Sequence, residues 1–216
     1  MIQLSFPESA SDGFQILFLG AHSDDIEIGC GGTILRLAEQ YPKACFHWMV
    51  FSAAGPRGEE ATRAANLFAG SRLHGPQLKT FRDGFLPYLG AEVKQVFEDL
   101  KASVSPDLIF THSRIDGHQD HRLIAELTWN TFRNHLILEY EIPKYDGDLG
   151  QPAVFVPLSK ETCEKKVAHL MEAFSTQRSK RWFEPETFTS LMRLRGMECN
   201  SPSGYAEAFY CRKVVL

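Results

Sequence analysis

Short apolar runs alternate with amphipathic segments along the first two thirds of the chain. The apolar runs cover residues 14–21, 45–52, 78–81 and 107–111. Their length and composition are typical of strands that are covered on both faces. Apolar residues recur at intervals of three and four in other segments, which we predict to be helices over residues 29–41, 57–68, 91–104 and 123–132. This alternation predicts a Rossmann-like α/β fold, with a mostly parallel sheet and helices on both faces.

The last third of the chain is less regular. We predict strands over residues 135–142 and 153–158, separated by an exposed loop at 143–148, and a closing edge strand over 208–216. Helices are expected over residues 159–174, with Ser159 as N-cap, and over 185–194. No internal repeat or linker interrupts the chain. We therefore expect one domain over residues 1–216, a layer sandwich with extra strands and helices in its C-terminal part.

Metal-binding side chains follow two of the predicted strands. His22, Asp24 and Asp25 come directly after the first apolar run, and His118 and His121 follow the fourth. Open α/β sheets bind ligands at the carboxyl ends of their strands, so we expect both groups on one rim of the sheet. A catalytic zinc ion takes three His or carboxylate ligands and leaves a fourth position for water. Two histidines and one aspartate from this set match that requirement.

The remaining polar residues suit the hydrolysis of an amide. Asp24 could take a proton from the zinc-bound water and pass it to the leaving amine. His118 could donate a hydrogen bond to the oxyanion of a tetrahedral intermediate, and Asp120 could orient one of the histidines. Either motif alone occurs often by chance, and Asp25 or Asp120 could be a plain helix cap. The metal site is favoured because both motifs end strands on one rim.

Composition and charge exclude several classes of partner. The 216 residues are 44% hydrophobic and 23% charged, with a net charge of −4 and no cluster of Lys and Arg, so nucleic acid is not expected to bind. No apolar run approaches the ~18 residues that span a bilayer, and the N-terminus lacks a signal-peptide pattern. The five cysteines form no CxxC pair and are expected to be reduced thiols. We expect a cytoplasmic protein without stable membrane insertion.

Two motifs carry a resemblance to a known family. Residues 21–33, AHSDDIEIGCGGT, resemble the AHPDDE motif of the LmbE-like (PIG-L) zinc deacetylases, and HQDH at 118–121 resembles their HPDH motif. This family includes N-acetylglucosaminyl-phosphatidylinositol de-N-acetylases and the deacetylases of mycothiol and bacillithiol synthesis. The resemblance extends roughly over residues 14–125. It implies zinc on a set of ligands formed by His22, Asp25 and His121, with Asp24 as general base and His118 as stabiliser of the transition state.

The same resemblance implies substrate-binding roles for two further residues. Arg57, in an R-x-x-E pattern with Glu60, is similar to the arginine with which relatives hold the sugar or phosphate of the substrate. Asp83, between Arg82 and Gly84, is similar to a carboxylate that binds sugar hydroxyls. An arginine at a helix start and an aspartate in an Asp-Gly turn are also common structural features. Both readings stay open for these two residues.

The chain departs from the family pattern at three positions. Ser23, Ile26 and Gln119 stand where the motifs have proline, glutamate and proline. None of these changes removes a ligand or the base. The aliphatic residue at position 26, followed by Glu-Ile-Gly, resembles the bacillithiol-type branch more than the phosphatidylinositol branch. The departures therefore put the identity of the substrate in doubt.

Three other features near these motifs have simpler interpretations. The glycines at 29–32 lack the G-x-G-x-x-G spacing of a phosphate-binding loop, so we expect them to form the turn at which a helix begins. Cys30 is expected to pack at that helix start rather than act as a thiolate. His112 ends the fourth apolar run and could line the pocket, which the sequence leaves open.

The sequence thus predicts a zinc-dependent hydrolase that removes the N-acetyl group from an N-acetylglucosamine-type amino sugar or its conjugate. Fe²⁺ could occupy the same ligands. Two alternatives remain: a non-catalytic carbohydrate-binding or regulatory protein with this fold, and a metal-dependent esterase or small-amide hydrolase. The expected partner is a small N-acetyl amino sugar or conjugate, and the aromatic and charged segments 140–145 and 178–182 could line its pocket or form a homo-oligomer interface.

Overall fold

The computed structural model describes residue 6 and residues 13–215, so the N-terminal residues on which the signal-peptide expectation depends lie outside it. Within the described residues, seven strands form one sheet in the order β3-β2-β1-β4-β5-β7-β6. The strands are β1 (Gln15–His22), β2 (Cys45–Ser52), β3 (Gln77–Leu78), β4 (Leu108–His112), β5 (Leu136–Tyr140), β6 (Val154–Leu158) and β7 (Tyr205–Cys211). The helices are α1 (Asp25–Gln40), α2 (Pro56–Ala69), α3 (Gly90–Ser103), α4 (Gln119–Thr131), α5 (Lys160–Ala173) and α6 (Pro185–Glu198), with short 3-10 turns η2 (Gly70–Arg72), η3 (Leu86–Leu89) and η4 (Ser175–Gln177).

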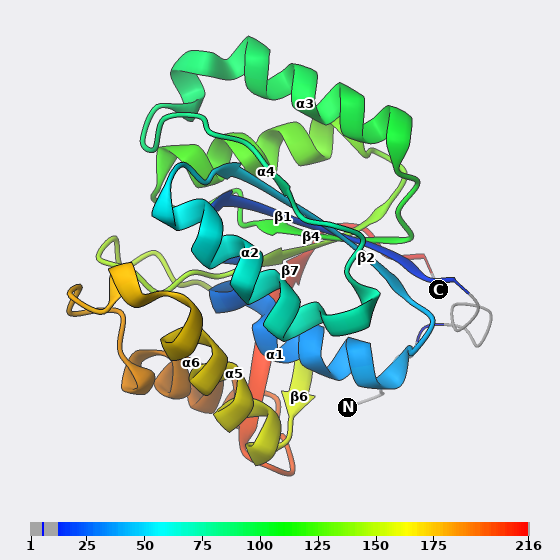
Figure 1. The fold of residues 1–216 in the computed structure, drawn as a ribbon. Coiled ribbons are helices and arrows are strands. Elements are labelled where there is room, and N and C mark those ends of the chain that lie inside the picture. The colour runs from blue at the N-terminus through cyan, green and yellow to red at the C-terminus, as the bar shows by residue number, and fades with distance from the viewer. Residues whose placement is uncertain (1–5, 7–12, 216) are drawn as a thin grey trace.

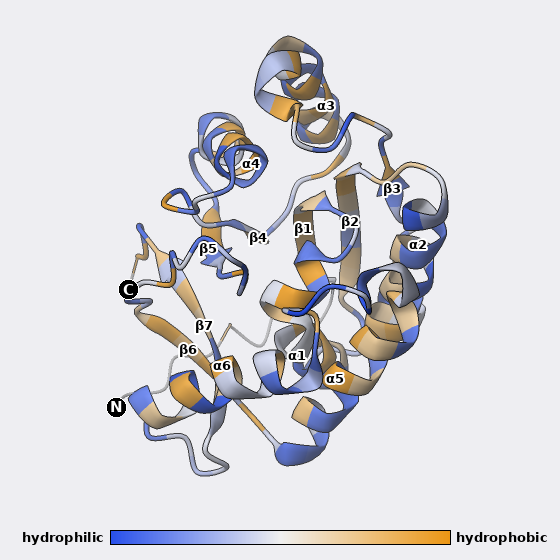
Figure 2. Cartoon of the chain, turned by 90° about the vertical axis from the view of Figure 1, so that its left-hand side faces the viewer, coloured by the Kyte–Doolittle hydropathy of each residue, from blue (hydrophilic) through white to orange (hydrophobic). Residues whose placement is uncertain are grey.

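The sheet lies between two layers of helices. Helices α3 and α4 cover one face, and α1, α2, α5 and α6 lie on the other (Figure 1). The five strands β1 to β5 run parallel to one another. Hydrophilic and hydrophobic stretches alternate along the helices, as amphipathic helices on a sheet require (Figure 2). The predicted Rossmann-like fold with a mostly parallel sheet is confirmed.

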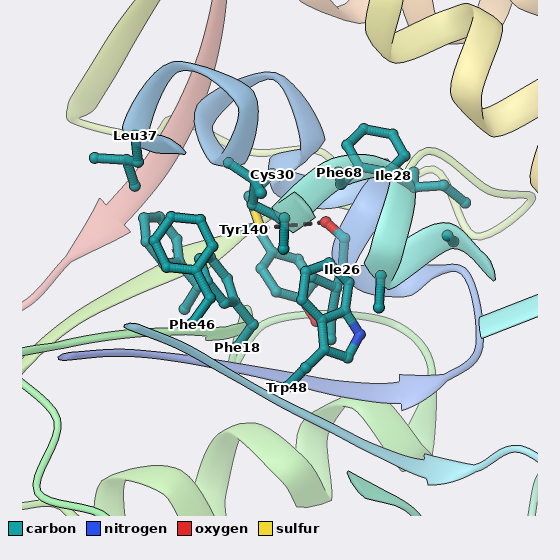
Figure 3. Packing of buried hydrophobic residues seen from close by; sticks show 14 of the residues in the cluster. Phe18, Ile26, Ile28, Cys30, Leu37, Phe46, Trp48, Phe68 and Tyr140 are labelled. Carbon is teal, nitrogen blue, oxygen red and sulfur yellow. Dashed lines mark hydrogen bonds between the residues drawn. The ribbon is translucent and has the colours of Figure 1, made fainter. Parts of the chain in front are cut away.

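The larger half of the core lies under α1. Phe18, Phe46 and Trp48 extend from the strands toward Ile26 and Cys30 of this helix (Figure 3). All five side chains are almost fully buried. The strands therefore need large apolar residues on both faces, which explains why they appear as continuous apolar runs rather than alternating patterns.

The C-terminal strand occupies a different place from the predicted one. β7 was expected at an edge, but it lies between β5 and β6 and pairs antiparallel with both. Its central residues, 206–209, are buried, whereas the middle of β6 is partly exposed. β6 is therefore the edge strand. The run of apolar residues that predicted a strand carries no information on which neighbours the strand will pair with.

Helix α1 begins at Asp25, four residues before the predicted start at Gly29. The glycines lie inside the helix, where close packing requires them: a Cβ on Gly29 would lie 2.3 Å from the ring of Tyr140. The expected glycine turn is therefore wrong. Cys30 has non-helical backbone angles of φ −142° and ψ 18°, which divide the helix into two parts at a kink.

Two buried side chains from the C-terminal third hold this kink. Glu207 of β7 accepts hydrogen bonds from the backbone N–H groups of Gly32 and Thr33, at 2.8 and 2.6 Å. Lys166 of α5 donates to the carbonyl oxygen of Ile28 at 2.7 Å and pairs with Glu207 at 2.6 Å. A carboxylate thus caps the start of the second part of α1, and a cation caps the end of the first part, as the helix dipole favours. The first part then points its own N-terminus at the end of β1.

The Gly29→Ala variant is expected to lose roughly 1–3 kcal/mol of unfolding free energy, because the added methyl group must displace the Tyr140 ring. That ring is held by a hydrogen bond of 2.6 Å from its hydroxyl to the carbonyl oxygen of Leu19. Urea unfolding followed by circular dichroism measures the change. Gly90→Ala is the matched control, since Gly90 has helical angles and, among the described residues, no atom lies within 4 Å of where its added Cβ would stand. It should unfold at or slightly above the wild-type urea concentration. Equal midpoints for Gly29→Ala and wild type would contradict the packing argument.

Candidate active site

The two sequence motifs meet at the point where the strand order reverses. From β1, the chain builds outward through β2 and β3 on one side and through β4 and β5 on the other. The carboxyl ends of β1 and β4 therefore flank a crevice, the position where doubly wound sheets bind ligands. Residues 22–25 follow β1 and residues 112–121 follow β4, so both motifs face this crevice.

The donor groups of the three predicted metal ligands lie close together. Nδ1 of His22 is 3.1 Å from Nε2 of His121 and 3.3 Å from Oδ2 of Asp25. Oδ1 of Asp25 is 3.5 Å from Nε2 of His121. Tetrahedral zinc with bonds of about 2.0–2.2 Å places its ligand atoms about 3.3–3.6 Å apart. The two separations that involve Asp25 lie in this range, and the His22–His121 separation is slightly shorter, so the donor set suits a divalent metal ion such as zinc.

Neighbouring residues offer overlapping sets of donors. Among the described residues, every group of three or more potential ligands contains His22 or His121. These groups are His22 with His118 and His121, Asp25 with His112 and His121, and His22 with Asp83 and Asp120. The capacity to bind a metal is thus concentrated in this crevice.

The ring nitrogens that point away from the three-ligand set are held by carboxylates. Oδ2 of Asp120 lies 3.2 Å from Nε2 of His22, and Oδ2 of Asp116 lies 3.0 Å from Nδ1 of His121. Metal-binding histidines commonly have such partners, which orient the ring. Asp120 therefore stands where a residue that orients a ligand would stand. Sequence reasoning missed Asp116, although its position two residues before His118 in Asp-Gly-His was visible.

Charge in the crevice favours a cation. Burial alone lowers the pKa of His22, but the carboxylates of Asp25, Asp120 and Asp83 outweigh it and raise that pKa well above its ordinary value. Burial also opposes the ionisation of Asp116, yet the adjacent His121 holds the pKa of this carboxyl well below its usual range. The crevice thus contains several negative charges around two imidazoles, which is a favourable environment for a divalent ion.

Asp24 is buried at the N-terminus of α1 and forms an ion pair with Arg57. Its Oδ1 lies 2.7 Å from Nη2 of the guanidinium. Burial raises the pKa of Asp24 above its ordinary value in spite of this ion pair, and the neighbouring Asp25 adds to the effect. A carboxyl group with a raised pKa is suited to accept a proton and to return it within one reaction.

Glu60 and the turn η4 hold the guanidinium of Arg57 in place. Its Nη1 donates to Oε2 of Glu60 at 2.7 Å, and Glu60 in turn accepts hydrogen bonds from Thr176 and Ser175 of the turn η4. The guanidinium also lies 5.6 Å from the ring of Phe174. The R-x-x-E pattern thus orients the arginine toward Asp24. Its contact with a substrate stays a prediction.

His118 is the N-cap of α4, which begins at Gln119 and not at residue 123 as predicted. Its Nδ1 accepts the backbone N–H of Asp120 at 3.2 Å. Burial and the imidazoles of His121 and His22 lower the pKa of His118, so the ring is neutral at pH 7. The hydrogen of the neutral ring then resides on Nε2, which can donate a hydrogen bond without a positive charge.

Three other residues named from the sequence take defined places. His112 is fully buried, lies with Nε2 3.2 Å from Oδ2 of Asp25, and stacks on His121 with ring centroids 3.9 Å apart. Asp83 contacts Nε2 of His22 at 3.1 Å while 78% of its side chain stays exposed. Burial raises the pKa of the Cys30 thiol well above its ordinary value, and its Sγ donates to the Ile26 carbonyl, so a thiolate is not available there.

Comparison with known proteins identifies relatives of the same architecture. The uncharacterized deacetylase YaiS of Escherichia coli (strain K12) is 28% identical over 173 residues, which cover 75% of this chain and 91% of YaiS. N,N'-diacetylchitobiose deacetylase from Pyrococcus horikoshii superposes with a TM-score of 0.69 at 19% identity, covering 94% of this chain and 85% of its own. The 4-carboxy-2-hydroxymuconate hydratase GalB from Pseudomonas putida KT2440 does so with a TM-score of 0.67 at 17% identity, covering 94% and 98%. At these identities the two structures demonstrate a shared fold.

A match to a family model shows the family. The family model described as GlcNAc-PI de-N-acetylase, PIG-L, matches residues 17–132, which is more than half of the chain and includes both motifs of the crevice. Within the described residues, no helix is long and apolar enough to cross a membrane. The chain belongs to the PIG-L family of GlcNAc-PI de-N-acetylases.

Proposed function

We propose that this protein is a zinc-dependent hydrolase that removes the N-acetyl group from an N-acetylglucosamine-type amino sugar or its conjugate, releasing acetate and a free amine. One observation carries the proposal: the donor groups of His22, Asp25 and His121 approach one another to 3.1–3.5 Å, and the residue next to Asp25 in the chain, Asp24, is a buried carboxyl group outside this set. A site that only bound carbohydrate would need neither the donors nor Asp24. Membership of a de-N-acetylase family and the similarity to YaiS support the same reaction.

The three ligands would be His22, Asp25 and His121. A zinc ion held there supplies Lewis-acid activation of water and of the amide carbonyl group. Asp24 removes a proton from the attacking water and later delivers it to the leaving nitrogen, so that a neutral amine departs. His118 donates its Nε2 hydrogen to the carbonyl oxygen as negative charge develops on it. The reaction consumes one water molecule and breaks the C–N bond, and the proton that Asp24 takes from water ends on the amine.

Two residues would hold the sugar. Arg57 has donors beyond those used by Asp24 and Glu60, and it lies next to the base. The exposed carboxylate of Asp83 lies next to His22, where it could accept hydrogen bonds from sugar hydroxyls. A neutral, hydroxyl-rich substrate would match a guanidinium beside the base and an exposed carboxylate beside His22.

Acetate release from a panel of substrates tests the proposal. The purified protein is stripped of metal and assayed with no metal, with Zn²⁺ and with Fe²⁺ on free N-acetyl sugars and on nucleotide-, thiol- and lipid-linked ones. We expect acetate and amine in equal amounts, only with metal present, from at least one N-acetyl sugar. Acetyl esters of the same sugars run in parallel: faster cleavage of the esters would show an esterase. Zinc binding without any product would instead support a binding protein.

A further inference from the structure

We propose that Asp116, held by Lys144 from the loop between β5 and β6, fixes the imidazole of His121 with its hydrogen on Nδ1, so that Nε2 is left free for a metal. Asp116 is thus a positioning residue for the metal ligand rather than a ligand itself. This inference rests on the proposed metal site, but its central measurement needs no metal.

The two carboxylate oxygens of Asp116 have different partners. Oδ2 faces Nδ1 of His121 at 3.0 Å. Oδ1 accepts the backbone N–H of His118 at 2.8 Å and lies 3.0 Å from Nζ of Lys144. The side chain of Asp116 is only 2% exposed, so water does not replace any of these partners. With both partners of Oδ1 being donors, only Oδ2 is available to accept the imidazole hydrogen.

Lys144 reaches this position because its loop is fastened to the loop between β4 and α4. Its Nζ also pairs with Asp148, and Asp148 accepts the backbone N–H of Gly117. The two loops pack closely: a Cβ on Gly117 would lie 2.8 Å from the Cβ of Asp146. The Lys144 side chain is 10% exposed. The ammonium group is therefore a built part of the crevice and not a mobile surface charge.

The base of this loop is fixed by the C-terminal part of the chain. Arg195 of α6 forms a two-pronged ion pair with Glu141, at 2.9 and 2.7 Å, and donates to the carbonyl oxygen of Gly150 at 3.1 Å. Glu141 also accepts the backbone N–H of Gly150 at 3.2 Å. The two ends of the loop are thus held together, which places Lys144 beside Asp116.

These contacts predict how the isosteric substitution Asp116→Asn changes the imidazole of His121. In Asp116→Asn, the new amide has one acceptor and one donor group. The His118 N–H and Lys144 both require the acceptor, so the amide NH₂ must face Nδ1 of His121. Nδ1 must then act as acceptor, and the ring hydrogen moves to Nε2, the nitrogen that the metal needs. With its hydrogen on Nε2, His121 binds the metal more weakly. Substitution of the residue that hydrogen-bonds to a metal-binding histidine commonly lowers metal affinity about 10- to 100-fold.

The test uses the full-length protein in two measurements. The ring ¹⁵N shifts of His121, read by NMR in the metal-free state, report which nitrogen carries the hydrogen, and competition with a chromogenic chelator gives the Zn²⁺ affinity. For wild type we expect the Nδ1–H form. For Asp116→Asn we expect the Nε2–H form and an affinity about 10- to 100-fold lower. Lys144→Met should keep the Nδ1–H form, because the Asp116 carboxylate can only accept, but its Zn²⁺ affinity should lie between the two, because Oδ1 loses one of the partners that hold it. Lys94→Gln, which breaks an ion pair with Glu98 on α3, is the matched control and should behave as wild type.

The outcomes separate the inference from the proposed function. A wild-type protein that shows the Nδ1–H form but binds no zinc would overturn the metal site and leave the role of Asp116 standing. An Asp116→Asn protein that keeps the Nδ1–H form and binds zinc within about threefold of wild type would overturn the role of Asp116. If Asp116→Asn does not fold, Lys144→Met decides: a Zn²⁺ affinity equal to that of wild type there would refute the inference that Lys144 holds Asp116 in place.

Discussion

The Asp24→Asn variant is expected to hydrolyse its best N-acetyl sugar with a kcat about 100- to 10,000-fold below that of wild type. Asparagine has the same size and can still accept the hydrogen bond from Arg57, but it cannot take the proton from water. Because Asp24 is not one of the three proposed ligands, the zinc content of the variant should equal that of wild type. Initial rates of acetate release, together with metal analysis of the same samples, measure both quantities.

The control for this variant is Asp99→Asn. Asp99 is an exposed residue of α3 whose Oδ1 accepts a hydrogen bond from Gln95 of the same helix. It should keep wild-type kcat and KM. Near wild-type turnover by Asp24→Asn would contradict the assignment of Asp24 as the base. Loss of both turnover and zinc would show that Asp24 acts on the metal site and not on the proton.

Removal of a ligand should have an effect of a different kind. His121→Ala is expected to lose bound zinc on dialysis, with an affinity more than about 100-fold lower, and to release no acetate above background. The change removes one of three donors and leaves the buried carboxylates of Asp25 and Asp116 without their common partner. Metal analysis after dialysis and the acetate assay with added zinc measure the result.

His74→Ala serves as the control for the loss of an imidazole. The centroid of the His74 ring lies 5.3 Å from that of the His47 ring, and the two rings are tilted against each other. Its zinc content should match that of wild type. Should His121→Ala retain one zinc ion per chain after dialysis, the ligand set His22, Asp25 and His121 would have to be replaced by the set in the described residues that lacks His121, which is His22, Asp83 and Asp120.

Local patterns predicted most strands, and they placed the starts of α2, α3, α5 and α6 within one residue, but they misplaced the starts of α1 and α4. The apolar runs at 14–21, 45–52 and 107–111 match β1, β2 and β4 within a residue. The starts of α1 and α4 were each predicted four residues too late. In both cases the helix depends on groups that a local pattern does not identify. Distant Lys166 holds the end of the first part of α1 and Glu207 caps the part after the kink, whereas an imidazole caps α4.

In the candidate site, too, some residues could be predicted from local patterns and others could not. Residues at strand ends, such as His22 and His121, could be named because a polar group that ends an apolar run is visible in the chain. Asp116 was missed, and His112 was left open, because their relevance depends on which rings they face. Lys144 lies in a loop that the sequence marks only as exposed, and its burial follows from contacts with a loop almost thirty positions earlier.

The sequence by itself determined the order of strands and helices and the chemistry at the strand ends, because both depend on short-range periodicity and residue type. Only the tertiary structure decided that β1 and β4 are neighbours, that β7 enters between β5 and β6, and that two loops join at Asp116 and Lys144. These are pairings between segments far apart in the chain. Their free energy comes from burial and hydrogen bonds that no local segment contains, so no local pattern can predict them.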